Sequence, residues 1–185
     1  MKKVLITGAT GYIGSHLARA LLSDCEVYCL IRKPLKSAYI KDIQTQIRTL
    51  LYDGSYESME AALASSCPDV VYHLAAYYTG SHSGEHIQKL LDSNLIMGLH
   101  LLEAMFACRI PAFVYATTVT TCDETAKYRP LTLYAATKHA FSDLVEYYTK
   151  IGTFKAVSVM LSDTYGPGDQ RPKVLNLIRQ SILTG

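Results

Sequence analysis

The sequence lacks an uninterrupted apolar run near the roughly 18 residues that a membrane-spanning helix needs. We also expect no signal peptide, since residues 1–3 lead only into a short apolar stretch that ends at Gly8. No basic run stands out, and the formal net charge of the 185 residues is only +2. We therefore expect no membrane or nucleic-acid partner, and a cytoplasmic location.

Cysteine is sparse and shows no pairing pattern. The five cysteines are Cys25, Cys29, Cys67, Cys108 and Cys122, an odd number at scattered positions. Cys25 and Cys29 bracket a predicted strand, which would hold their side chains too far apart for a disulfide. We therefore expect reduced thiols and no metal site.

Internal repeats, low-complexity segments and linkers rich in proline or glycine are also missing, so residues 1–185 are expected to form one domain. Hydrophobic residues make up 49% of the chain, which argues against disorder. Apolar runs and helical periodicities alternate along the chain. Strands are predicted at residues 3–7, 25–31, 49–52, 70–75, 112–116 and 156–161. Helices are predicted at residues 13–22, 56–64, 86–108, 133–151 and 174–183.

This alternation predicts an α/β fold built on a doubly wound parallel sheet. Strands that are buried on both faces show near-continuous apolar character, and helices then cover the two faces of the sheet. We expect about six to seven strands in the Rossmann-type arrangement that binds dinucleotides.

A glycine-rich loop follows the first predicted strand and opens the first helix. Its glycines, Gly8, Gly11 and Gly14, would allow a tight turn, close approach of backbone to a pyrophosphate, and close packing of helix on strand. The helix N-terminus would add amide donors and partial positive charge. The alternative is a purely structural turn. We favour a dinucleotide site, with contacts from Gly8, Thr10, Gly11, Tyr12, Ile13 and Gly14.

Two basic residues end the second predicted strand. An acidic residue at this place would hydrogen-bond the ribose hydroxyls of NAD, but the chain has Arg32 and Lys33 instead. Either cation could pair with the 2′-phosphate of NADP. The sequence therefore favours NADP(H) over NAD(H), and the alternative is a solvated basic turn.

Tyr134 and Lys138 lie four residues apart on a predicted helix, so their side chains share one face. A free tyrosine has a pKa of about 10 and is a poor acid or base at neutral pH. A neighbouring ammonium would lower that pKa and make the phenol useful for moving a proton. Taken alone, the pair is weak evidence, because a surface contact is the more common reason for this spacing on a helix.

Together these motifs resemble the extended short-chain dehydrogenase/reductase family of NAD(P)-dependent sugar epimerases, dehydratases and reductases. The resemblance covers almost the whole chain and rests on residues 8–14, 73–76 and 165–168 in the expected order. It implies that Tyr134 is the proton donor or acceptor at a sugar oxygen. Thr118 would hydrogen-bond the same oxygen, and Lys138 would hold the nicotinamide ribose and lower the pKa of Tyr134.

The resemblance also implies cofactor contacts outside the glycine loop. Asp53 would contact adenine, although it could instead cap the following helix. Asn94 matches a recurrent helix asparagine, although it could simply form a helix-to-loop hydrogen bond. Thr118 could be an ordinary strand-end hydroxyl, and His73 is better explained as a packed strand residue. The implied contacts are Arg32, Lys33, Asp53, Leu74, Ala75, Ala76, Asn94, Thr117 and Lys138.

The departures from the family pattern reduce the number of reactions that we expect of this chain. The family's dehydratases place Asp and Glu directly after the catalytic threonine, whereas this chain has Val119 and Thr120. We therefore do not expect 4,6-dehydration. The short loop with Arg129-Pro130 and the segment 165–169 look most like those of CDP-abequose and CDP-paratose synthases. Those enzymes reduce a 4-keto-6-deoxy sugar nucleotide with NADPH.

Two alternatives stay open at this point, a nucleotide-sugar epimerase of the same family and a non-catalytic dinucleotide-binding module. Family members continue for roughly another hundred residues or more, which build much of the sugar-nucleotide site. We therefore expect the substrate domain to be largely absent from residues 1–185. Apolar surface left uncovered would favour self-association, most simply as a homodimer.

Overall fold

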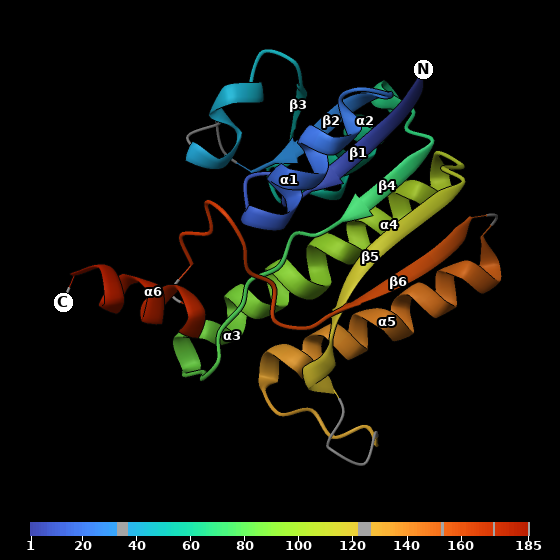
Figure 1. Cartoon of the computed structure of the whole chain (residues 1–185). Coiled ribbons are helices and arrows are strands. Elements are labelled where there is room, and N and C mark those ends of the chain that lie inside the picture. Colours follow the sequence, from blue (N-terminus) through green and yellow to red (C-terminus); the bar gives the residue numbers. More distant parts are fainter. Residues whose placement is uncertain (33–36, 122–126, 153, 172, 185) are drawn as a thin grey trace.

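A parallel sheet forms the centre of the fold in the computed structural model, which describes residues 1–32, 37–121, 127–152, 154–171 and 173–184. Within these residues, six parallel strands pair in the order β3-β2-β1-β4-β5-β6 (Figure 1). The strand order reverses between β1 and β4, as in doubly wound dinucleotide-binding folds. The predicted fold class is therefore confirmed. The strands are β1 (Lys2–Thr7), β2 (Cys25–Ile31), β3 (Arg48–Leu51), β4 (Val70–His73), β5 (Ala112–Thr118) and β6 (Lys155–Leu161).

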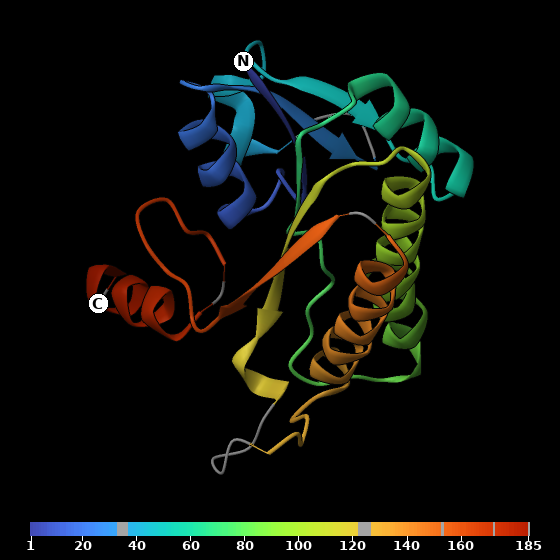
Figure 2. The same cartoon turned by 90° about the vertical axis from the view of Figure 1, so that its right-hand side faces the viewer.

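Helices cover both faces of this sheet, as Figure 2 shows. Alternate residues of β1 point to opposite faces, so Val4 and Ile6 join one core cluster whereas Leu5 joins the other. The first cluster lies under α1 and η1, and the second lies under α2, α4 and α5. The helical segments are α1 (Tyr12–Leu21), η1 (Ala38–Ile43), α2 (Tyr56–Ser66), α3 (Gly84–Leu91), η2 (Asp92–Ile96), α4 (Met97–Ala107), η3 (Val119–Thr121), α5 (Leu133–Ile151) and α6 (Val174–Thr184).

The single helix predicted at residues 86–108 contains a π turn, η2, between α3 and α4. The turn carries two buried polar side chains, Ser93 and Asn94. Each has a hydrogen-bond partner from another part of the fold, which offsets the cost of burial. Single π turns inside α-helices are frequent at functional sites.

Several predicted boundaries shift by a few residues. β4 ends at His73 rather than residue 75, because its partner β1 ends at Thr7, whose carbonyl accepts from the N–H of Leu74. β5 extends to Thr118, paired with Leu161 of β6. The 3₁₀ segment η1 was not predicted. The helix predicted at residues 133–151 is confirmed without change as α5.

The described cysteines are free thiols. Cys25 and Cys29 are buried in β2, and burial raises the pKa of Cys29 to about 12. Cys67 is exposed and Cys108 is partly buried. Cys122 lies outside the described residues.

One helical stretch among the described residues, Gly84–Ala107, is long and apolar enough to cross a membrane by length and composition alone. Its most apolar window has a mean hydropathy of 1.3, and half of that window is buried within the protein. The sequence prediction considered only uninterrupted apolar runs and missed this stretch, because Lys89 and Asp92 interrupt it. Leu101, Leu102 and Met105 of this stretch are fully buried in the core of the sheet, as expected of a core helix.

Gly98 lets α4 and α5 approach closely, and replacing it with alanine is expected to destabilise the fold. A Cβ atom at Gly98 would overlap the ring of Phe141. Overpacking of this kind costs about 1–3 kcal/mol. Urea unfolding measures the loss, with Gly84→Ala as the control, because nothing lies within 4 Å of a Cβ there. An equal free energy of unfolding for both variants would contradict the packing argument.

Candidate cofactor and active site

A groove of about 650 Å³ opens at the carboxyl ends of β1, β2 and β4, at the point where the strand order reverses. Ligands of open α/β sheets bind at this position. Most of the predicted cofactor residues of the glycine loop, the β2 end and the β4 end line the groove. Its walls are formed by Gly8, Thr10, Gly11, Leu30, Ile31, Arg32, Ser37, Leu74, Ala75, Ala76 and Met97.

The glycine loop fits closely against the turn after β4. Gly8 has a φ of +74°, and a Cβ atom there would lie 2.6 Å from the backbone nitrogen of Ala75. A Cβ atom on Gly14 would overlap the backbone of Gly8. Gly11 is the N-cap of α1 and offers no side chain to cap the helix, and uncapped first-turn amides suit an anionic ligand. The loop therefore fits the pyrophosphate of a dinucleotide.

Tyr12 and Ile13, which were also predicted to bind cofactor, are not among the residues that line the groove. The ring of Tyr12 packs edge-on against His16 and Tyr39, with centroids 4.7 and 6.0 Å away. Ile13 is partly buried. The side chains of these two residues therefore do not form the walls of the groove.

Arg32 lies in the wall of the groove, as predicted for a residue that reads the 2′-phosphate. Its Nη1 donates a hydrogen bond of 3.2 Å to Oγ of Ser93, on the π turn. Lys33, the other predicted cation, lies outside the described residues. Sequence reasoning missed Ser93, because no periodicity marks an inward-facing serine in a π turn.

Asp53 is engaged by its own neighbours. Its carboxylate accepts hydrogen bonds from the N–H and the hydroxyl of Ser55, at 2.9 and 2.6 Å. These bonds hold the pKa of Asp53 at about 2. The alternative that Asp53 caps α2 is wrong in detail, because Ser55 is the N-cap and accepts from the N–H of Ser58.

Asn94 joins the turn after β4 to the helix that carries the tyrosine and lysine. Its Oδ1 accepts from the N–H of Tyr77 at 2.8 Å, and its Nδ2 donates to the Tyr77 carbonyl and to Oγ1 of Thr137. Thr137 lies between Tyr134 and Lys138 in α5. Asn94 therefore forms the helix-to-loop link that the sequence left open, and the link positions α5.

Tyr134 and Lys138 both lie in α5, which packs against β5 and η3. Figure 2 shows η3 beside the first turns of α5. Only 3% of Lys138 is exposed, and burial lowers its pKa to about 8. Thr118 ends β5, and its hydroxyl shares a hydrogen bond of 3.0 Å with that of Thr120. The neighbouring Thr117, a predicted cofactor contact, is partly buried.

The pKa of Tyr134 moves opposite to the direction expected from sequence. Burial raises it, and the nearby phenol of Tyr78 raises it further. The Tyr78 ring packs edge-on against Tyr134 at a centroid distance of 5.0 Å. The prediction that Lys138 lowers the pKa of Tyr134 is therefore wrong, and with a raised pKa the phenol stays protonated at neutral pH. Tyr78 had no sequence signal that singled it out.

His73 is a packed strand residue, as the sequence favoured. It is 1% exposed, and its ring stacks on Phe113 and contacts Phe141. Burial and the charge of Lys138 lower its pKa to about 3, so it is neutral. Its Nδ1 shares a 2.8 Å hydrogen bond with Oγ1 of Thr7, which also accepts from the N–H of Ala75. This network holds the β4 turn against the glycine loop.

One family of known proteins matches almost the whole chain. The sequence model of the NAD dependent epimerase/dehydratase family matches residues 4–185. CDP-abequose synthase from Salmonella typhimurium is 27% identical over 176 residues, which are 95% of this chain and 57% of that protein.

Solved structures of similar proteins share this fold. UDP-glucose 4-epimerase from Thermus thermophilus, in complex with NAD, is 30% identical with a TM-score of 0.80, over 92% of this chain and 58% of that one. UDP-glucuronic acid 4-epimerase from Bacillus cereus, also in complex with NAD, is 27% identical with a TM-score of 0.85, over 98% and 63%. The chain thus spans less than two thirds of the length of each of these proteins.

Proposed function

Because the chain belongs to the NAD dependent epimerase/dehydratase family, we propose that it is an NAD(P)-dependent oxidoreductase acting on a nucleotide-activated sugar. Its specific reaction is reduction of a 4-keto-6-deoxy sugar nucleotide with NADPH. The observation that carries this proposal is the buried Lys138 on the same helical face as a phenol that stays protonated, Tyr134. The similarity to CDP-abequose synthase supports the same reaction.

The proposed mechanism uses three side chains. Tyr134 donates its proton to the keto oxygen, a role for which a raised pKa is suited because the acid form dominates at neutral pH. Thr118 donates a hydrogen bond that orients the same oxygen. Lys138, with a pKa of about 8, remains mostly charged at pH 7 and stabilises negative charge that develops on the phenol oxygen. The bound dinucleotide supplies the hydride.

A 4-epimerase is the second candidate, favoured by the NAD-bound epimerase structures that share this fold. An epimerase returns its hydride to the sugar and so consumes no cofactor, whereas a reductase oxidises one NADPH per turnover. Incubating the chain with NADPH and a CDP-activated 4-keto-6-deoxy sugar tests the proposal. We expect oxidation of NADPH. Dinucleotide binding with no turnover on keto or hydroxy sugars would instead support a non-catalytic module.

We propose NADP(H) as the preferred cofactor, read by Arg32. Arg32→Ala should weaken NADPH binding by about tenfold or more, since hydrogen bonds between charged groups contribute about 1.5–3 kcal/mol. NADH binding should change by less than about twofold, because NADH has no 2′-phosphate. Calorimetry with both cofactors measures the difference between the two losses of affinity. Arg48→Ala is the control, since Arg48 is exposed on β3 and pairs with Glu26 of β2. Equal losses for NADPH and NADH would show that Arg32 does not read the phosphate.

We assign residues 1–185 to one dinucleotide-binding domain, with most of the family's sugar-binding domain outside it. Apolar side chains lie exposed on α4 and α5, among them Phe106, Tyr147 and Ile151, and this surface suits a homodimer. Sedimentation velocity would decide between monomer and dimer.

A further inference from the structure

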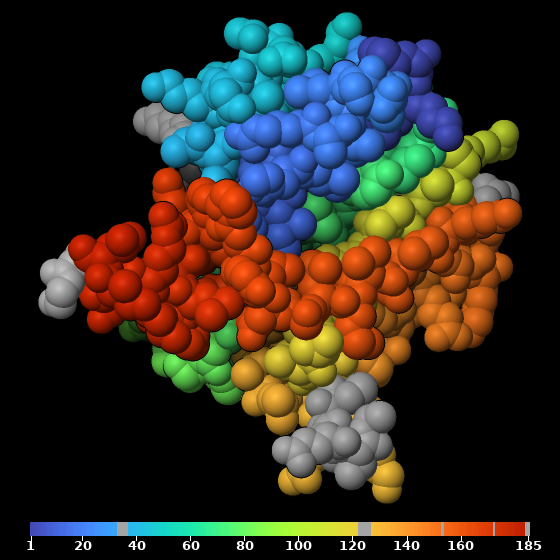
Figure 3. Space-filling model, viewed as in Figure 1, coloured from blue at the N-terminus to red at the C-terminus, as the bar shows by residue number. Residues whose placement is uncertain are grey.

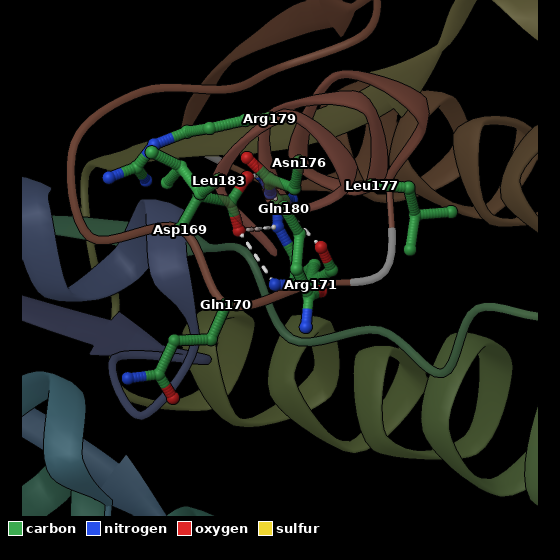
Figure 4. Close-up of a pocket in the computed structure, with 8 residues that line it drawn as sticks. All are labelled: Asp169, Gln170, Arg171, Asn176, Leu177, Arg179, Gln180 and Leu183. Carbon is green, nitrogen blue, oxygen red and sulfur yellow. Dashed lines mark hydrogen bonds and ion pairs between the residues drawn. The ribbon is translucent and has the colours of Figure 1, made fainter. Parts of the chain in front are cut away.

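A short segment after β6, residues 163–171, folds around an ion pair whose carboxylate is buried, and we call this segment the strap. The side chain of Asp169 is fully buried and accepts two hydrogen bonds of 2.7 Å, from Nε and Nη2 of Arg171 (Figure 4). The same Nη2 also donates to the carbonyl of Thr164 at 2.8 Å. A bidentate pair of this kind fixes the plane of the guanidinium group.

The fixed guanidinium group stacks on the glycine-loop helix. The Cζ of Arg171 lies 4.7 Å from the centroid of the Tyr12 ring, within the range of a cation–π contact. Two further features bring the strap against α1 and η1. The N–H of Gln170 donates to the hydroxyl of Tyr39 at 3.0 Å. Gly166 leaves room for the Tyr12 hydroxyl, because a Cβ there would lie only 2.5 Å from it.

The strap thereby contacts two segments that help to form the wall of the dinucleotide groove. Tyr12 is the first residue of α1 and directly follows Gly11, which lines the groove. Ser37 also lines the groove, donates to the Thr10 carbonyl at 2.7 Å, and lies two residues before Tyr39. Figure 3 shows the orange-red segment after β6 lying against the blue N-terminal part of the chain.

We propose that Arg171, oriented by Asp169, is a positioning residue for dinucleotide binding. A glycine-rich loop loses much conformational freedom when a ligand orders it. The stack of Arg171 on Tyr12 orders the first turn of α1 in advance, so less of the binding energy is spent on ordering. The inference rests on the proposed function only in requiring that the groove binds a dinucleotide. It adds that the strap, although distant in sequence from the residues that line the groove, contributes to the affinity for the dinucleotide.

Calorimetric titration of the chain with NADP⁺ tests this role. Arg171→Ala should weaken binding by about tenfold, as expected for loss of a partly buried cation–π contact. Arg171→Lys should not restore affinity, since an ammonium cannot make the bidentate pair and the planar stack together. The control is Lys173→Ala, which removes a 3.1 Å ion pair with exposed Asp163 and should change affinity by less than about twofold.

A second variant separates positioning from folding. Tyr12→Leu keeps the Asp169–Arg171 pair and should weaken NADP⁺ binding as much as Arg171→Ala. The double variant should lose little more affinity than either single variant, because each single variant already removes the stack of Arg171 on Tyr12. Equal affinity of Arg171→Ala and Lys173→Ala, or additive losses in the double variant, would overturn the inference. An unaltered chain that binds no dinucleotide would overturn the proposed function as well.

Discussion

Replacing Tyr134 with phenylalanine should lower the rate of keto-sugar reduction by about 10²- to 10⁴-fold, the range typical of a lost general acid. The ring of Tyr134 packs against Tyr78, and phenylalanine keeps that contact. The affinity for NADPH should therefore change by less than about twofold. Steady-state oxidation of NADPH measures the rate, and calorimetry measures the affinity.

The matched control for this substitution is Tyr147→Phe. Tyr147 lies on the same helix, α5, and is 57% exposed. Its loss of a hydroxyl should leave the rate unchanged. A Tyr134→Phe variant that keeps more than about half of the activity would remove Tyr134 from the mechanism.

Replacing Lys138 with methionine should abolish reduction and at the same time stabilise the fold. The pKa of Lys138 is about 8 in the folded chain, below its usual 10.5. Each unit of that difference corresponds to about 1.4 kcal/mol, so burying the charge costs on the order of 3 kcal/mol. Methionine has a similar length and carries no charge. Its free energy of unfolding at pH 7 should therefore exceed that of the unaltered chain.

The pH dependence of this difference follows from the direction of the shift. Below about pH 8 the lysine is charged in both the folded and the unfolded chain, so the full cost is present. As pH rises from 8 towards 10.5, the folded lysine loses its proton first and the cost disappears. The stability advantage of Lys138→Met should therefore be largest below pH 8 and fade above it.

Urea unfolding at several pH values measures this advantage. Lys150→Met is the control, since Lys150 is exposed on the same helix and pairs with Glu146 at 2.7 Å. Exposed pairs contribute about 0–1 kcal/mol, so this variant should differ little. A Lys138→Met variant that is less stable than the unaltered chain at pH 7 would contradict the burial argument. It would indicate that Lys138 has favourable contacts that outweigh its burial.

Much of this fold could be predicted from sequence because strong local patterns agree with it. β2 and α5 were predicted with their observed bounds, since an apolar run and a long amphipathic stretch are each flanked by turn residues. The glycine loop was predicted from spacing, and its geometry explains why Gly8 has no substitute. Its φ is positive, and the Ala75 backbone fills the space that a side chain would need.

The features that escaped prediction depend on contacts between distant segments. In the π turn, Ser93 and Asn94 form hydrogen bonds with Arg32, Tyr77 and Thr137, which are distant in sequence. No local pattern encodes such partners. The predicted direction of the Tyr134 pKa shift was wrong because the spacing on a helix does not show how deeply the phenol is buried, and burial raises this pKa.

The ion pair in the strap was missed for another reason. Asp169 and Arg171 are two residues apart in an irregular segment, where no periodicity predicts which side chain is buried. Asp169 becomes buried only because Arg171 satisfies it and packs on Tyr12. A pair of charges in a loop looks, in sequence, like any solvated turn.

Transfer of deuterium from NADPH labelled at its transferable hydrogen to a CDP-activated 4-keto-6-deoxy sugar tests the central claim most directly. The account predicts that the sugar product gains one deuterium at C4, detected by mass spectrometry and NMR, and that Tyr134→Phe suppresses the transfer. A sugar that changes configuration without gaining deuterium, or that does not react while NADPH stays bound, would contradict it.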